Sequence, residues 1–137
     1  MIRQRVDIPA ADWLVDIFYD VRPSDAECVA DSLYRMGCPK KHIRKAYQLV
    51  RSGVPNQGLT YSDRQSRHTL IVVGHASDLF SAFNTLEHES NHLEIHICEE
   101  YGIDPYSEEA SYLSGDIKES IARNAWLTMR KIFLSIL

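Results

Sequence analysis

Residues 68–102 read HTLIVVGHASDLFSAFNTLEHESNHLEIHICEEYG, and this stretch decides the fold that we expect. Its start, rich in β-branched residues, predicts a buried strand that ends at Gly74. Ser77 is a good helix N-cap, and the apolar spacing after it predicts a long helix over 78–101 that Gly102 closes. The stretch therefore places a core strand directly before a long helix.

One side of this helix carries an apolar stripe at helical spacing, which predicts that it packs on a core. The stripe consists of Leu79, Phe83, Leu86, Leu93 and Ile97. His88 and His92 lie off the stripe, so we expect both imidazoles at the surface.

Residues 13–21 predict a second strand, with Trp13, Val15, Ile17 and Tyr19 on one face at a period of two. Two helices should follow it. Ser24 is the expected N-cap of the first, which runs to about Met36 and ends at Gly37. Pro39 opens the second, over 40–51, which ends near Gly53.

A short strand around 59–61 and a last helix, opened by Pro105 and Ser107 and extending toward the C-terminus, complete the expected elements. The order is two or so strands, two helices, two strands and two helices. Such runs favour an α+β fold in which a small, mainly antiparallel sheet packs on helices. At 137 residues, we expect 1–137 to form a single domain.

Composition excludes several classes of protein. A hydrophobic content of 45% and a charged content of 25% are ordinary for a globular domain. No apolar run approaches the roughly 18 residues that span a bilayer, and the N-terminus lacks an apolar signal core, so we expect a cytoplasmic protein without a membrane partner. The net charge of −4 argues against nucleic acid as a partner.

The segment His88-Glu89-Ser90-Asn91-His92 carries the strongest chemical signal. Two histidines four residues apart lie on one helix face and can hold one Zn²⁺. Glu89 is turned about 100° from His88, where it reaches a water on the metal rather than acting as an obvious ligand. This composition yields about 0.02 such HExxH motifs by chance.

A catalytic zinc site needs a third protein ligand. Glu108 and Glu109 follow the reversal Gly102-Ile103-Asp104-Pro105, so the start of the last helix can fold back beside the zinc helix. Both residues also suit a first helical turn, where acids favour the helix dipole, and the spacing alone does not choose between them.

Two more histidines are candidates for supporting roles. His96 lies roughly 12 Å along the helix axis from His88, too far to share one tetrahedral ion, so we expect it beside the site or in a structural role. His75, just after the strand, is a candidate donor to a developing oxyanion, although the favoured interpretation is a plain loop histidine.

These residues resemble the gluzincin branch of zinc metallopeptidases, and in particular short HExxH proteins of bacteria and their phages. The likeness covers roughly residues 58–116 and rests on Gly58-Leu59-Thr60-Tyr61-Ser62, Val72-Val73-Gly74, the HExxH segment and Glu108-Glu109-Ala110-Ser111-Tyr112-Leu113. It implies a minimal zincin-like domain whose edge strand holds an extended peptide. It also favours Glu108 as the third ligand.

The leading hypothesis is therefore a zinc metallopeptidase with one Zn²⁺ and a peptide or protein substrate. His88, His92 and Glu108 would bind the metal, Glu89 would activate water, and His75 or Tyr112 would assist the oxyanion. One alternative is a non-catalytic zinc protein. Another is a helix-turn-helix-like regulatory module, whose basic second helix carries Lys40, Lys41, His42, Arg44 and Lys45.

Overall fold

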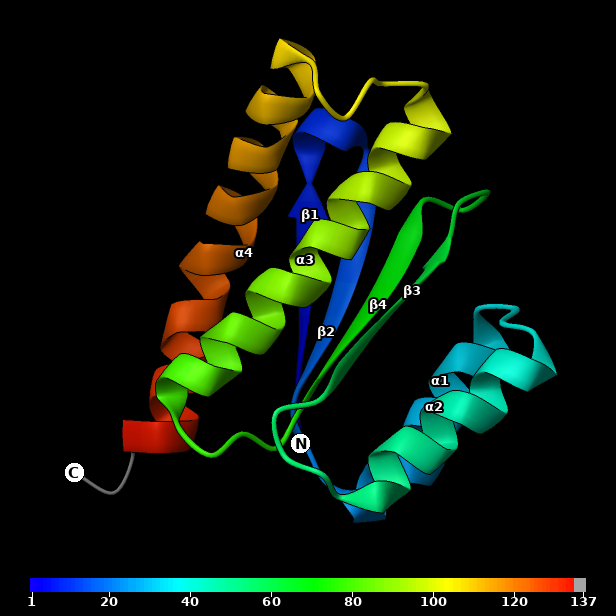
Figure 1. The fold of residues 1–137 in the computed structure, drawn as a ribbon, viewed down its shortest axis with the longest axis vertical. Coiled ribbons are helices and arrows are strands. Elements are labelled where there is room, and N and C mark those ends of the chain that lie inside the picture. Colours follow the sequence, from blue (N-terminus) through cyan, green and yellow to red (C-terminus); the bar gives the residue numbers. More distant parts are fainter. Residues whose placement is uncertain (135–137) are drawn as a thin grey trace.

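The computed structural model describes residues 1–134 as a four-stranded sheet with helices on both faces (Figure 1). The strands are β1 (Ile2–Ile8), β2 (Trp13–Val21), β3 (Gly58–Asp63) and β4 (His68–Gly74). The helices are α1 (Ala26–Arg35), α2 (Lys40–Ser52), α3 (Leu79–Tyr101) and α4 (Glu108–Leu134), with 3₁₀ turns at Pro9–Ala11 and Pro23–Asp25. The expected α+β class is confirmed.

The spatial order of the strands is β1-β2-β4-β3, which places β3 and β1 at the two edges. β1 pairs with β2, and β3 with β4, in antiparallel register, as expected of a mainly antiparallel sheet. The central pair, β2 with β4, is parallel. The chain reaches this arrangement because α1, α2 and β3 lie between the two strands in sequence and carry the chain back to the start of the sheet.

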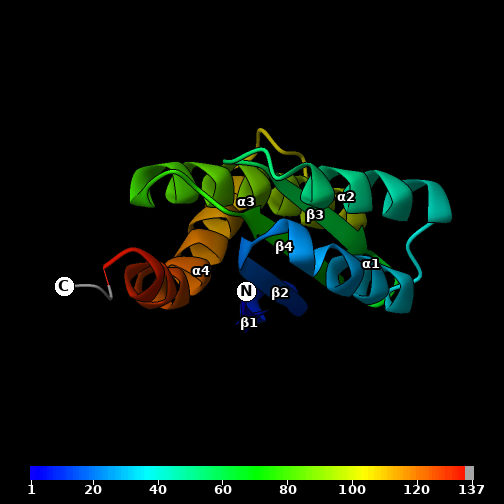
Figure 2. The same cartoon turned by 90° about the horizontal axis from the view of Figure 1, so that it is seen from below.

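Helices cover the two faces of the sheet (Figure 2). Each face has its own cluster of buried apolar side chains. On one face α3 and α4 pack against the side chains that the sequence predicted for β2 and against Ile71 and Val73 of β4. On the other face α1 and α2 pack against Phe18, Leu70 and Val72. The apolar residues of α1 and α2 are therefore part of the core on this face of the sheet.

The element boundaries agree with the sequence patterns except at the caps. The helix expected at Ser24 begins later, because Pro23–Asp25 forms a 3₁₀ turn and Asp25 takes the N-cap position of α1. Ser77 does not cap α3; the Asp78 side chain accepts the backbone N–H of Ser81 instead. Gly102 ends α3 in the left-handed conformation, as predicted.

Two features lie outside the sequence patterns. The sequence patterns do not reveal β1, because only Val6 and Ile8 of this edge strand are buried and its charged residues are exposed. α4 is described to Leu134, and the last three residues of the expected helix lie outside the described part. Among residues 1–134, no helix has the length and apolar character needed to cross a membrane.

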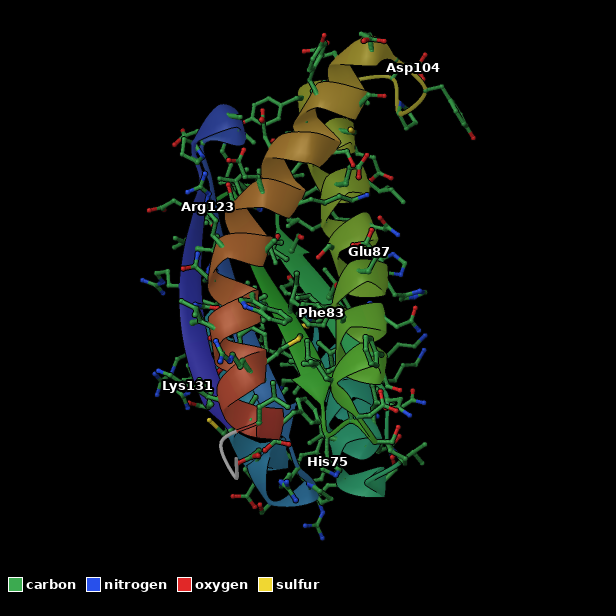
Figure 3. The ribbon with its side chains drawn as sticks, turned by 90° about the vertical axis from the view of Figure 1, so that its left-hand side faces the viewer. His75, Phe83, Glu87, Asp104, Arg123 and Lys131 are labelled. Carbon is green, nitrogen blue, oxygen red and sulfur yellow. The ribbon has the colours of Figure 1, made fainter. Side chains whose placement is uncertain are left out.

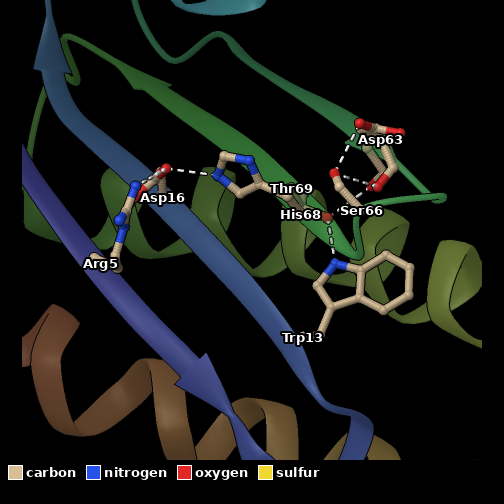
Figure 4. Close-up of polar contacts among 8 residues, drawn as sticks. Arg5, Trp13, Asp16, Asp63, Ser66, His68 and Thr69 are labelled. Carbon is tan, nitrogen blue, oxygen red and sulfur yellow. Dashed lines mark hydrogen bonds and ion pairs between the residues drawn. The ribbon is translucent and has the colours of Figure 1, made fainter. Parts of the chain in front are cut away.

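A polar cluster joins β1, β2 and β4 on the face that α1 and α2 leave partly open (Figure 4). Arg5 donates two hydrogen bonds to Asp16, at 2.8 and 3.1 Å, and His68 Nε2 lies 2.6 Å from the second carboxylate oxygen. Burial alone would raise the pKa of Asp16, but the hydrogen bonds from Arg5 and His68 outweigh it and lower that pKa.

Asp16→Asn tests this cluster through the pH dependence of stability. A carboxyl whose pKa is lowered in the folded state stabilises the fold above its unfolded pKa, about 3.9, and loses that contribution as the pH falls through the folded value. We expect Asp16→Asn to lower the free energy of unfolding by about 1 kcal/mol near pH 7, a modest value because Arg5 is largely exposed. The difference in unfolding free energy between the two proteins should become smaller below about pH 4. Urea unfolding of both proteins at several pH values measures this difference in unfolding free energy. A difference that does not change with pH would contradict the stabilising role of the Asp16 carboxylate.

Candidate metal centre

The two sides of α3 face different neighbours. On one side Phe83 stacks on Trp126 of α4, and Glu87 forms an ion pair with Lys118 (Figure 3). On the other side Thr85 and Glu89 are buried against β3. His88 and His92 are exposed and lie next to this second side, as helical periodicity requires. The histidine pair therefore faces the β3 edge of the molecule and not α4.

His88, Glu89 and His92 form a compact donor group. Each offers one ligand atom, and these atoms all lie within 4.8 Å of one another. The two imidazole rings are 5.0 Å apart between centroids and meet edge to face. Zinc ligands at about 2.0–2.1 Å from a tetrahedral ion are separated by about 3.4 Å, a gap that rotation of two exposed rings can close. Two imidazoles and a carboxylate fit the donor preferences of Zn²⁺.

Glu89 is held in place by β3. Glu89 is only 5% exposed, and the Thr60 hydroxyl lies 2.9 Å from Oε2 and 3.2 Å from the Glu89 backbone carbonyl oxygen, so its single proton is directed mainly at Oε2, the nearer acceptor. Within residues 1–134 no protein group donates to Oε1, which leaves this oxygen available to a ligand or a water. Thr60 thus fixes the orientation of the carboxylate beside the two histidines.

Gly58 permits this approach of helix and strand. A Cβ atom at Gly58 would lie 2.7 Å from Thr85 Cγ2, 2.9 Å from Glu89 Cγ and 3.0 Å from the Val72 carbonyl oxygen. No side chain fits these distances without moving α3 away from β3. The glycine is therefore a requirement of the contact that positions Glu89.

The structure does not bring Glu108 or Glu109 to the histidine pair. Both are exposed in the first turn of α4, and that helix packs on the opposite side of α3. Lys118 contacts Glu87, one residue before His88, and Glu108 precedes Lys118 by ten residues, about 15 Å along the helix. This geometry therefore does not provide the third ligand expected from α4, neither Glu108, which the resemblance favours, nor Glu109.

The two expected oxyanion donors also lie apart from the pair. Tyr112, on α4, is 70% exposed. His75 lies at the opposite end of the molecule from Asp104, near the start of α3, where its Nδ1 is 3.0 Å from Asp20 (Figure 3). Neither side chain therefore lies beside His88 and His92.

His96 belongs to a hydrogen-bond chain through the sheet. Trp13 Nε1 donates to Thr69 at 2.8 Å, Thr69 and Ser62 share a 2.7 Å contact, and Ser62 lies 2.7 Å from His96 Nδ1. Trp13 can only donate, so one consistent direction has Thr69 donate to Ser62 and Ser62 donate to Nδ1. Burial, followed by the positive charge of Arg64, lowers the pKa of His96. This arrangement is that of a neutral structural histidine, one of the two roles expected for it.

Sequence reasoning missed Gly58, Thr60 and Ser62 as residues of the site, although the resemblance quoted them. The signal that points to them is the alternation of small polar residues with Leu59 and Tyr61 along β3. Such alternation places Thr60 and Ser62 on the α3 side of the strand.

Gly58→Ala tests the close contact between α3 and β3. We expect it to lower the free energy of unfolding by about 1–3 kcal/mol, because the added methyl group overpacks a filled contact. Gly115→Ala is the matched control, since a Cβ there meets nothing within 4 Å and the position is inside α4. That control should stabilise the protein by about 0.5–1 kcal/mol. Equal effects of the two substitutions in urea unfolding would refute the packing argument.

No protein-family model, no curated protein and no solved structure matches this chain.

Proposed function

We propose that the protein is a zinc-dependent hydrolase that cleaves peptide bonds. The observation that carries this proposal is the group formed by exposed His88 and His92 with buried Glu89, whose ligand atoms lie within 4.8 Å of one another beside the free edge of β3. His88 and His92 would hold the metal through their imidazoles. Zinc bound there supplies Lewis-acid chemistry to a water molecule and to the carbonyl of a scissile bond.

Glu89 is the proposed general base. Its Oε2 is occupied by the Thr60 hydroxyl, and its Oε1 is free to accept a proton from water. The water oxygen joins the carbonyl carbon, and Glu89 passes the proton to the amine nitrogen as the C–N bond breaks. The hydrogen bond from Thr60 keeps the carboxylate in one orientation through both transfers.

The free edge of β3 supports a polypeptide substrate. β3 pairs with β4 on one side only, so its other row of backbone N–H and C=O groups can pair with an extended chain. Strand addition of this kind holds a peptide mainly by its backbone, and it would place the peptide next to the surface of α3 that carries His88 and His92.

A second candidate function is a non-catalytic zinc protein in which Glu89 is the third ligand. The structure favours it by one observation: no carboxylate from α4 approaches the histidine pair, and Glu89 is the acid whose oxygen lies within 4.8 Å of both imidazoles. The two candidates assign different roles to the same carboxylate, so one substitution separates them.

Glu89→Gln distinguishes a base from a ligand. If Glu89 is the base, the variant should retain about one equivalent of zinc while hydrolysis falls by roughly 10²–10⁴-fold. Zinc is measured by elemental analysis after gel filtration, and hydrolysis by mass spectrometry of a proteome-derived peptide mixture. His92→Ala should lose zinc in either case. Glu100→Gln, an exposed acid on the same helix, is the control that should change neither quantity.

The alternative results have distinct meanings. Loss of zinc from Glu89→Gln, with no cleavage by the unaltered protein, would assign Glu89 as a ligand and support the non-catalytic role. A wild-type protein that binds no zinc would exclude both candidates.

A further inference from the structure

Charge is strongly segregated along this chain. Residues 32–62 contain no Asp or Glu, and they carry six cations: Arg35, Lys40, Lys41, Arg44, Lys45 and Arg51. The whole chain has a net charge of −4, so the remaining residues carry −10. An even mixture of charges would need no explanation, whereas a segment free of acids in an acidic protein indicates an anionic partner.

Most of these cations lie on α2 and are free of internal partners. Lys40, Lys41, Arg44, Lys45 and Arg51 are all exposed. None of the five forms an ion pair with a carboxylate in residues 1–134, whereas Arg35 pairs with Asp31 of α1. The lysines and arginines of α2 therefore do not serve the fold through ion pairs.

A groove separates α2 from β3 on the face opposite α3. It has a volume of about 360 Å³ and an apolar floor that includes Leu49 and Leu59, with His42 and Lys45 among its lining residues. Thr60 also lines it. Because the Thr60 hydroxyl holds the Glu89 carboxylate, the groove and the metal centre meet at one residue of β3.

The pleat of β3 decides how a bound strand would use this groove. Leu59 and Tyr61 pack toward α2, whereas Thr60 and Ser62 point to α3. A chain paired with the free edge has the same alternation, so every second side chain faces α2 and the others face the histidine side. The residues that face α2 meet an apolar floor and Lys45, with Lys41 one helical turn away.

We propose that the substrate is an acidic extended peptide, with Asp or Glu at positions that face α2; this inference rests on the proposed peptidase function. Lys45 lines the groove, and Lys41 lies one helical turn before it on the same side of α2. These two lysines select carboxylates, while the backbone of β3 supplies the pairing that every sequence shares.

The acidic residues near the groove do not counteract its preference for an acidic peptide. Asp63, at the end of β3, accepts a hydrogen bond from the Ser66 hydroxyl at 2.7 Å. Glu99 on α3 forms an ion pair with Arg64. No Asp or Glu lines the groove itself.

An acidic peptide fits these features better than nucleic acid does. Duplex recognition needs a basic surface wide enough to meet successive phosphates, and outside residues 32–62 this chain repels a polyanion with its net charge of −10. The cations also border an unpaired strand edge and an apolar floor, which suit a polypeptide backbone and its side chains.

Binding measurements test the proposal without requiring hydrolysis. Three labelled peptides share one Val/Thr framework and differ only in having Asp, Asn or Lys at every second position. By fluorescence anisotropy with the zinc-loaded full chain, we expect the Asp peptide to bind about tenfold more tightly than the Asn peptide, with a preference that salt weakens. N-methylation of the amides that face β3 should abolish binding, because it removes the ladder hydrogen bonds.

Lys41→Glu/Lys45→Glu should remove the roughly tenfold preference for the Asp peptide. Lys41→Gln/Lys45→Gln, which removes the charge without reversing it, should give an intermediate loss. Arg130→Glu/Lys131→Glu, two exposed cations on α4, is the matched control for net charge and should keep the preference. Unfolding curves confirm that each variant is folded.

Each outcome separates this inference from the proposed function. A preference for Asp without cleavage of any peptide would support an acidic-peptide site and refute the peptidase. Cleavage or binding without an acidic preference, or an absence of binding to all three peptides, would overturn the inference. Tighter binding of a labelled DNA duplex, lost in the lysine variants, would also overturn it and assign the basic helix to nucleic acid.

Discussion

The arrangement of the molecule depends on the burial of β4 on both of its faces. Ile71 and Val73 belong to one apolar cluster and Leu70 and Val72 to the other, so a single strand supplies both cores. A strand that is apolar on both faces needs a helical layer on each side. α3 and α4 form one layer and α1 and α2 form the other. β3, paired to β4 alone, is left as the edge between α3 and α2.

That edge position gives β3 two distinct surfaces and one free row of backbone groups. Gly58 lets α3 approach so closely that Glu89 is buried, and Thr60 then fixes the carboxylate by a hydrogen bond. The same strand turns Leu59 toward the groove beside α2. The helix α3, which carries the histidine pair, and the basic helix α2 therefore lie on either side of one strand edge, although about forty residues of sequence lie between Lys45 and His88.

The sequence patterns predicted most of the fold because they report local physics. Periodicity located β2, β4 and α3, and glycine marked the end of α3. The patterns do not reveal β1, because an edge strand buries few side chains. The two expected caps are wrong because a 3₁₀ turn at Pro23–Asp25 precedes α1, and because the Asp78 side chain caps α3 in place of Ser77. The histidine pair was also a local inference. The position of Glu108 could not be inferred locally, because it depends on the side of α3 against which α4 packs. Tertiary contacts such as the stacking of Phe83 on Trp126 set that side.

The side on which α4 packs has a chemical consequence. A zinc ion held by His88 and His92 would need further ligands, and in this fold Glu89 or solvent would supply them. Glu89 cannot be ligand and base at once, since a coordinated oxygen gives up the lone pair that would take a proton. Its Oε2 is already engaged with Thr60, so a single oxygen decides the role. Solvent in the remaining positions would leave Glu89 free to act as the base. The acidic side chains of a bound peptide would then meet the cations of α2, on the face of the strand opposite the histidines, and would not compete for the metal.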